Sequence, residues 1–407
     1  MADFIPDPEL EQLIAEVSIP HEAPVESGPT RPVGSSFSPL SAEIPSVELE
    51  KTGKLSHFLS EMVRQKGSDL LLLPGSLPVI RVNGRLMAIA AEELGEAEVE
   101  SLLAPQITPA LRRQLAEEGT ADFSLHFSSY GTGGPGWRLR LNLQRSRGKL
   151  VAGIRLLPDH IPSLEELHLP AALTKLVDRD RGLVLISGPT GSGKSTTLAT
   201  LVDHLNRHEG RHIISIEDPV EYEHRSRRCL VEQIEVGSDT PSFSIALRAA
   251  LRRDPDVILV GEMRDLETIS TVLTAAETGH LILSTLHTAD ATRAVHRIID
   301  VFPAAQQDQV RHQLALGLGA IICQQLLPTR DGRGRVPALE ILEATYPVRN
   351  LIRKQQTHLL YNEMMSGGGA MVQMEASLAE LVEKGVVDPE EARNRANRLD
   401  EIQRRLG

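Results

Sequence analysis

The amino-acid sequence predicts an α/β protein in which a parallel sheet wrapped by helices follows a small α+β domain. Three observations predict this fold class. Residues 188–196 fit the phosphate-binding loop pattern and stand between an apolar strand and a helix. After this loop, short apolar strands alternate with helices, as they do in parallel sheets. Before it, an Asn-Gly turn and alternating apolar residues indicate antiparallel hairpins.

Residues 1–50 are an acidic tail that we expect to be disordered. They hold ten Asp and Glu residues and a single basic residue, Arg31, and so carry −9 of the chain's formal charge of −12. With eight prolines and few apolar clusters, the tail cannot bury enough surface to offset its ordering entropy. One stretch, Pro8 to Val17, is amphipathic and suggests a docking helix, although composition alone favours a solvated tail.

Residues 51–158 are expected to form the small α+β domain. Its first apolar residues, within 55–62, are spaced for one face of a helix. Asn83-Gly84 is a strong hairpin signal between two strands. We expect further helices at 96–103 and 109–118, and strands at 69–73, 78–86, 122–127, 137–144 and 150–156.

A linker, residues 159–170, leads to the nucleotide-binding domain, residues 171–365. We expect strands at 183–186, 213–216, 257–260 and 280–286, and helices at 195–206, 243–253 and 266–277. From Thr292 onward the sequence predicts nearly continuous helix, interrupted by a hairpin at 328–337. Residues 366–407 are the expected C-terminal helical segment.

The phosphate-binding loop predicts that the protein binds ATP. Its glycines let backbone N–H groups close on phosphate oxygens, and the start of the following helix adds a positive dipole end. Lys194 is expected to reach the outer phosphates, and the Ser195 hydroxyl to ligate Mg²⁺. The expected nucleotide-binding residues are Gly188, Pro189, Thr190, Gly191, Ser192, Gly193, Lys194, Ser195 and Thr196.

Two glutamates at strand ends are the candidates for the hydrolytic chemistry. The carboxyl ends of parallel strands meet at one edge of the sheet, so Glu217 and Glu262 should lie near the loop. Hydrolysis needs one carboxylate to orient or deprotonate water and a second acidic group to hold Mg²⁺, usually through its waters. Glu262 occupies the Walker B position and is the expected metal-side carboxylate, together with Ser195. Each glutamate could instead be a helix cap or a surface ion pair.

Histidines stand at both ends of the strand 280–286. A lone histidine is more often structural, but His287 is placed to sense a γ-phosphate, while for His280 the two interpretations are balanced. The small domain also carries several arginines on its expected strands. Composition favours a solvated strand face for them, and the alternative is that some complete a neighbour's nucleotide site. These arginines are Arg81, Arg138, Arg140 and Arg155.

Composition argues against several function classes. Only 3% of the residues are aromatic, and residues 51–407 are nearly neutral, so no nucleic-acid partner is expected. The two cysteines, Cys229 and Cys323, lie far apart, which argues against structural zinc. The longest apolar run, 314–323, is about half a membrane span, so we expect no direct membrane insertion and a cytoplasmic location.

Three longer stretches of the chain resemble one family, the hexameric motor ATPases of type II secretion and type IV pili. Residues 213–222, which read IISIEDPVEY, are similar to the Asp box of this family. Its Walker B region is similar to residues 254–268, which read DPDVILVGEMRDLET, and its His box to residues 278–291. The resemblance covers the chain from about Leu55 to the C-terminus and leaves the tail outside.

The resemblance implies a RecA-like ATPase domain preceded by a small PAS-like domain. Glu217 matches the family's catalytic glutamate, Glu262 its Walker B glutamate, and His287 its His-box histidine. Arg140 and Arg155 lie in stretches similar to the family's arginine-bearing strands. The implied assembly is a homohexamer at the inner-membrane base of a pilus machine, where it uses ATP and Mg²⁺. The implied partners are an inner-membrane platform protein and a related paralogous ATPase.

Within this family the chain is most similar to pilus-retraction motors. Residues 347–354, PVRNLIRK, keep the centre of the retraction element, and the four-cysteine zinc module common in extension and secretion motors is missing. Two departures, Lys354 in place of glutamate and Leu71 in place of histidine, leave open a paralogue with an accessory role.

The sequence also leaves open an extension or secretion motor, a nucleic-acid translocase and a non-hydrolysing scaffold. The intact Lys194, Ser195, Glu217 and Glu262 disfavour the scaffold.

Overall fold

The structure, a computed structural model, describes residues 53–82, 85–127, 136–366 and 371–407. The expected tail and its docking helix, the Asn83-Gly84 turn and most of the turn at 131–136 lie outside the described residues. No helix in the described part of the chain has both the length and the apolar character needed to cross a membrane.

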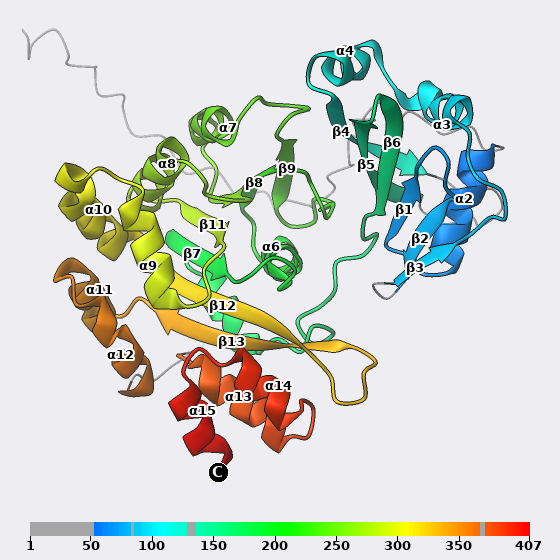
Figure 1. The fold of residues 1–407 in the computed structure, drawn as a ribbon. Coiled ribbons are helices and arrows are strands. Elements are labelled where there is room, and N and C mark those ends of the chain that lie inside the picture. Colours follow the sequence, from blue (N-terminus) through cyan, green and yellow to red (C-terminus); the bar gives the residue numbers. More distant parts are fainter. Residues whose placement is uncertain (1–52, 83–84, 128–135, 367–370) are drawn as a thin grey trace, which may run out of the picture. The chain divides into compact units, whose positions relative to one another are not determined.

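A six-stranded antiparallel sheet forms the first part of the described chain, with strand order β3-β2-β1-β6-β5-β4 (Figure 1). Apolar residues of its strands and of three helices bury one shared core, which includes Phe58, Leu70 and Leu141. The elements are α2 (Lys54–Arg64), β1 (Asp69–Leu72), β2 (Val79–Val82), β3 (Arg85–Ala88), α3 (Glu96–Leu103), α4 (Pro109–Glu117), β4 (Thr120–Phe127), β5 (Trp137–Ser146) and β6 (Lys149–Leu156).

A seven-stranded sheet with order β13-β12-β7-β11-β10-β8-β9 follows. All neighbouring strands are parallel except β12 and β13. Its strands and the helices between them are β7 (Gly182–Ser187), α6 (Lys194–His208), β8 (His212–Glu217), β9 (Leu230–Glu235), α7 (Phe243–Ala250), β10 (Val257–Val260), α8 (Leu266–Glu277), β11 (Leu281–Leu286), α9 (Ala291–Asp300), α10 (Ala304–Gly317), β12 (Leu318–Pro328) and β13 (Arg335–Glu343).

Helices cover both faces of this sheet, as Figure 1 shows. Leu183 and Leu185 of β7 pack into an apolar cluster with α7 to α10, whereas Val184 and Ile186 pack into a second cluster with α6. Every residue of β7 is buried, so its apolar residues 183–186 follow one another directly and do not alternate with polar ones. The predicted α/β fold class is confirmed: a mainly parallel sheet wrapped by helices follows a small domain.

The expectation of nearly continuous helix after Thr292 was wrong for residues 318–343, although the chain does turn at the expected hairpin, 328–337. β12 and β13 are strands of eleven and nine residues that extend the sheet, and β12 pairs with β7 in parallel. A fully buried apolar run has no periodicity that separates a helix from a strand, and the β-branched pair Ile321-Ile322 favours the strand. The short strand β9 was also missed.

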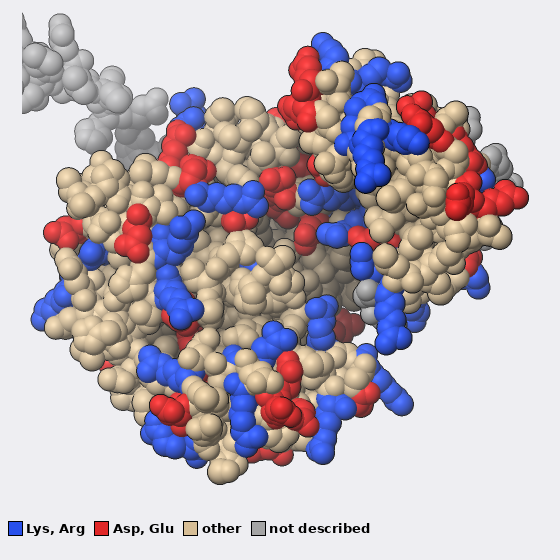
Figure 2. All heavy atoms as spheres, viewed as in Figure 1, with Lys and Arg blue, Asp and Glu red and all other residues tan. Residues whose placement is uncertain are grey.

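The C-terminal part of the chain is helical, as expected. Three of its helices pack on the β12–β13 hairpin and share an apolar cluster with Leu327, Val336 and Ala338. Basic and acidic side chains are interspersed over the face shown in Figure 2, in keeping with a nearly neutral body. The helices are α11 (Tyr346–Arg353), α12 (Leu360–Ser366), α13 (Met374–Glu383), α14 (Pro389–Arg395) and α15 (Leu399–Leu406).

Candidate active site

The phosphate-binding loop leaves β7 and enters α6, as its sequence predicts. Gly193 precedes the helix in the left-handed conformation, with φ of 86°, which glycine adopts without strain. The buried Lys194 folds back over the loop, and its Nζ donates to the carbonyl oxygens of Gly188 at 2.9 Å and Pro189 at 3.2 Å. Burial lowers the pKa of Lys194, against the opposing charges of Glu262 and Glu221. The loop lysine therefore has polar partners within the chain and lies where phosphates would be held.

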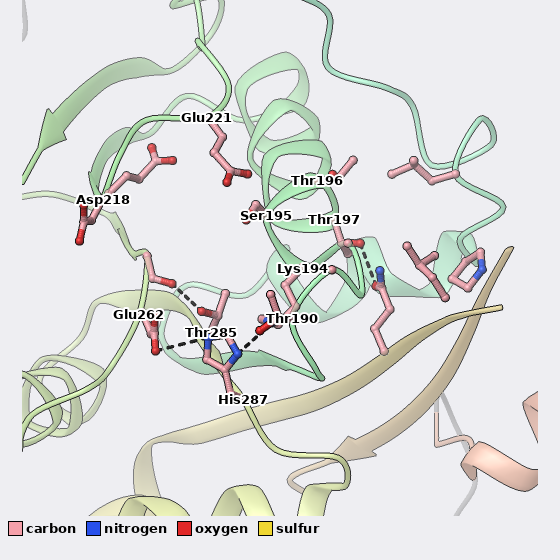
Figure 3. Close-up of a pocket in the computed structure, with 18 of the residues that line it drawn as sticks. Thr190, Lys194, Ser195, Thr196, Thr197, Asp218, Glu221, Glu262, Thr285 and His287 are labelled. Atoms are coloured by element: carbon pink, nitrogen blue, oxygen red, sulfur yellow. Dashed lines mark hydrogen bonds and ion pairs between the residues drawn. The ribbon is translucent and has the colours of Figure 1, made fainter. Parts of the chain in front are cut away.

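His287 stands between Lys194 and Glu262 (Figure 3). Its Nδ1 is 3.5 Å from Lys194 Nζ, and its Nε2 is 3.3 Å from a carboxylate oxygen of Glu262. The other oxygen of Glu262 is 2.7 Å from Arg264 Nη2. Burial by itself would raise the pKa of Glu262, but the Arg264 hydrogen bond and the positive charges of Arg264 and His287 outweigh it and lower that pKa. This arrangement therefore favours the ionised form of Glu262.

Glu217 ends β8, the strand next to β10, and its two hydrogen-bond donors are uncharged. Ser215 Oγ donates to one of its carboxylate oxygens at 2.7 Å, and Gln233 Nε2 of β9 donates to the same oxygen at 3.2 Å. Burial raises the pKa of Glu217 above the usual glutamate value in spite of these two hydrogen bonds. A carboxylate that is held by neutral donors and has a raised pKa is a stronger proton acceptor than an ordinary glutamate.

One cleft collects most of the predicted site residues. Its cavity of about 790 Å³ is within the usual range for small-molecule sites. Glu217, Glu262, His287 and Arg155 line it, as do six residues of the loop: Thr190, Gly191, Gly193, Lys194, Ser195 and Thr196. The other three loop residues, Gly188, Pro189 and Ser192, do not line the cleft. His280 lies at the opposite end of β11 and does not line the cleft.

The arginines of the small domain differ in their contacts. Arg155 lines the cleft and donates from Nε to Asp69 at 2.8 Å. Arg140 lies directly opposite Arg155 in the β5–β6 register but is not among the lining residues, and its nearest acidic partner is Asp122 at 3.5 Å. Arg138 is the most buried of the set: its Nε is 3.1 Å from Glu223, and it donates to the carbonyl oxygen of Val220.

The oxygen donors of the cleft fit Mg²⁺. Ser195, in the first turn of α6, and the ionised Glu262 both line the cavity. Mg²⁺ prefers oxygen ligands and is usually held by one or two carboxylates together with substrate phosphates and water. A hydroxyl, one carboxylate and a triphosphate satisfy that preference, so these two residues are the ones that would hold the ion.

Three polar residues of the site were not predicted from the sequence. Gln233 orients Glu217 from β9. Ser187 ends β7 and joins the loop strand to Thr288, whose backbone N–H donates to Ser187 Oγ at 2.9 Å. Gln324 of β12 contacts the loop itself. Of the three, only Ser187 could have been found from the sequence, because it directly precedes the loop. Gln233 and Gln324 lie on β9 and β12, which were not predicted to be strands.

Comparison with known proteins gives one family match. Residues 161–375 match the family described as type II/IV secretion system protein. The matched segment contains the phosphate loop, Glu217, Glu262 and His287.

Two curated relatives from Pseudomonas aeruginosa align with most of the chain. The type IV pilus retraction ATPase PilT is 42% identical over 343 residues, which are 84% of this chain and 98% of PilT. The type IV pilus ATPase PilU is 40% identical over 346 residues, which are 85% of this chain and 89% of PilU. Because the two identities are so close, identity alone does not separate these relatives.

A crystal structure of the pilus retraction motor PilT with bound ADP is also similar to this chain. The TM-score is 0.79 at 41% identity, over 87% of this chain and 100% of the PilT chain.

Proposed function

Since this chain belongs to the type II/IV secretion system protein family, we propose that it is a motor ATPase that couples ATP hydrolysis to the retraction of type IV pili. One observation carries the proposal: the phosphate loop, Glu217, Glu262 and His287 converge on one cleft. Together they supply a phosphate cradle, a proton acceptor and an ionised metal-side carboxylate, which are the parts that nucleoside triphosphate hydrolysis needs. The fold similarity to a motor that binds ADP supports this assignment of the cleft.

In the proposed reaction each side chain has a separate task. Lys194 turns from the loop carbonyls to the outer phosphates, and Mg²⁺, held by Ser195 and Glu262, would neutralise phosphate charge. Glu217 orients the attacking water and accepts its proton. His287 lies 3.5 Å from the lysine and 3.3 Å from Glu262, so it is placed to report whether a γ-phosphate is present.

We propose a homohexamer in which the arginines of one subunit complete the site of another. Arg155 reaches the cleft of its own chain, while Arg140 does not. Arg140 is therefore the better candidate for the site of a neighbouring subunit, where a guanidinium would stabilise charge that develops on the phosphates. The assembly would act at the cytoplasmic base of the pilus, on an inner-membrane platform protein.

Retraction is favoured over extension by the RNLIR stretch within α11 and by the similarity to PilT along nearly its whole length. An accessory ATPase related to PilU is the second candidate, because PilU is almost as similar. A related paralogous ATPase is then a further partner of the hexamer.

Gene deletion in the host tests the direction of the motor. Loss of a retraction motor should leave surface pili in excess and abolish twitching, and the wild-type gene should restore both phenotypes. A Lys194→Ala gene, matched in expression, should restore neither, because its product cannot bind and turn over ATP. Loss of surface pili after the deletion would indicate an extension motor, and unchanged twitching would indicate an accessory ATPase.

A further inference from the structure

Gln324 lies behind the phosphate loop, in the middle of β12. Its side chain is only 3% exposed, and both ends of its amide are hydrogen bonded. The Nε2 donates to the carbonyl oxygen of Ser192 at 2.6 Å. The Oε1 accepts from Thr197 Oγ1, in the first turn of α6, at 2.8 Å. One side chain thus holds the last turn of the loop and the start of the helix together.

The loop glycines make room for this residue. A Cβ at Gly188 would clash with the carbonyl oxygen of Gln324, and a Cβ at Gly193 would lie 2.9 Å from its Nε2. Gly188 and Gly193 are therefore needed for close approach to β12 as well as for the shape of the loop. The loop and Gln324 form one packed unit.

The contact with Ser192 determines where the next amide points. In a trans peptide the carbonyl oxygen and the following N–H lie on opposite sides of the chain. When Gln324 binds the Ser192 carbonyl oxygen, the N–H of Gly193 must face away from β12. Phosphate-binding loops work by aiming such N–H groups at the anion. Because Gly193 lines the cleft, an N–H that faces away from β12 is placed to meet an anion there.

The next residue in β12, Gln325, offers a matched comparison. It is also largely buried, at 9% exposed, but successive residues of a strand point to opposite faces. Its Nε2 donates to the carbonyl oxygen of Arg395 in α14 at 3.2 Å. The two glutamines share their chemistry and burial, yet one holds the loop and the other holds the C-terminal helices.

We propose that Gln324 is a positioning residue for nucleotide binding, which presets the phosphate loop by binding the Ser192 carbonyl oxygen and the Thr197 hydroxyl. The inference rests on the proposed nucleotide site. It adds that the affinity of this site depends on a side chain from outside the loop and its helix.

Replacement of each glutamine by methionine, which keeps length and burial but removes the hydrogen bonds, tests the proposal. The measurement is the affinity of the full-length chain for a fluorescent ADP analogue. It should fall about tenfold or more in Gln324→Met, because tenfold corresponds to the loss of one good hydrogen bond. It should stay within about twofold of wild type in Gln325→Met. The KM for ATP should rise with the ADP dissociation constant, while kcat changes less. Equal affinities of the two variants would overturn the proposal. A wild-type chain that failed to bind the analogue would instead refute the proposed nucleotide site.

Gln324→Glu gives a second test that does not depend on comparing the stability of variants. At alkaline pH the carboxylate would repel the Ser192 carbonyl oxygen, whereas its protonated form can donate to that oxygen. The affinity for the ADP analogue, relative to wild type at the same pH, should therefore recover as the pH falls. An affinity ratio that did not change with pH would contradict the positioning role. The comparison with wild type at each pH corrects for the other charged or titratable groups of the cleft and of β13. These include Lys194, Glu217, Glu262, His287, Arg335, Glu340 and Glu343.

Discussion

Two glutamates lie at the carboxyl ends of neighbouring strands of the same sheet, and their surroundings shift their pKa values in opposite directions. Glu217, the last residue of β8, is held by a serine and a glutamine, and burial raises its pKa. Glu262, after β10, is also partly buried, but Arg264 and His287 outweigh that burial and lower its pKa. Where two carboxyl groups of one site are pushed apart in this way, their environments assign their roles. Glu217 is suited to take a proton, and Glu262 to remain an anion beside cations.

The largest effect should come from Glu217→Gln. The amide can still accept from Ser215, so the fold and ATP binding should be retained, but it cannot accept a proton from water. We expect ATP turnover to fall about 10²- to 10⁴-fold, the range for loss of a general base, with ATP affinity within a few-fold of wild type. Phosphate release and nucleotide binding measure the two quantities. Turnover near the wild-type rate would remove Glu217 from the proposed role.

Glu262→Gln should have a smaller and different effect. Removal of the ionised carboxylate should reduce turnover about 10- to 100-fold, which is the typical effect of losing a group around a metal. It should also raise the Mg²⁺ concentration needed for half-maximal rate. A Mg²⁺ titration of both variants separates the two glutamates. If Glu217→Gln and Glu262→Gln changed the Mg²⁺ requirement equally, the two carboxylates would share one task. That result would contradict the separate roles assigned to them.

Glu340 of β13 is a buried carboxyl group outside the cleft and serves as a control. It is 2% exposed and accepts from the backbone N–H of Ala291 at 2.7 Å, and burial raises its pKa to about 7 from the usual value of 4.5. Because the folded-state pKa is raised, its contribution to stability is complete below the unfolded pKa and is lost as the pH rises through about 7. The free energy of unfolding should therefore fall across this window by about 3 kcal/mol.

Urea unfolding of wild type and Glu340→Gln, without nucleotide and at one protein concentration, measures this effect. The variant should lack this part of the pH dependence, while its ATP turnover changes little. Parallel stability curves for the two proteins would show that Glu340 does not titrate in this window.

Arg264→Ala should have the smallest effect. Arg264 is 65% exposed, so solvent screens its ion pair with Glu262, and exposed pairs of this kind are worth at most about 1 kcal/mol. We expect turnover to change by less than about fivefold, with His287 still beside Glu262. A loss as large as that of Glu262→Gln would mean that Arg264 itself contacts the nucleotide.

The sequence was sufficient for the parts of the site that local chemistry dictates. A glycine-rich loop before a helix, and polar residues directly after apolar strands, predict their own positions, because parallel strands end at one edge of the sheet. This is why Lys194, Glu217, Glu262 and His287 were all placed in one site, and the structure brings them to one cleft.

The remaining parts depend on contacts between distant segments. Gln324 reaches the loop from β12, which was expected to be helical, and Gln233 reaches Glu217 from the missed strand β9. No local pattern marks a glutamine for such a task. The sequence could not tell which arginine of the small domain lies at the nucleotide site, for a similar reason. Arg140 and Arg155 are register partners on β5 and β6, and only the fold shows that Arg155 lines the cleft.

The pH dependence of single-turnover ATP hydrolysis tests the central claim most directly, namely that Glu217 is the proton acceptor. A base with a raised pKa loses activity as the pH falls, and it does so at a higher pH than an ordinary glutamate. Wild type and Glu262→Gln should both lose rate on the acid side, with an apparent pKa above the usual 4.5. The residual rate of Glu217→Gln should lack this loss. An acid loss that persisted unchanged in Glu217→Gln would contradict the assignment of Glu217 as the base.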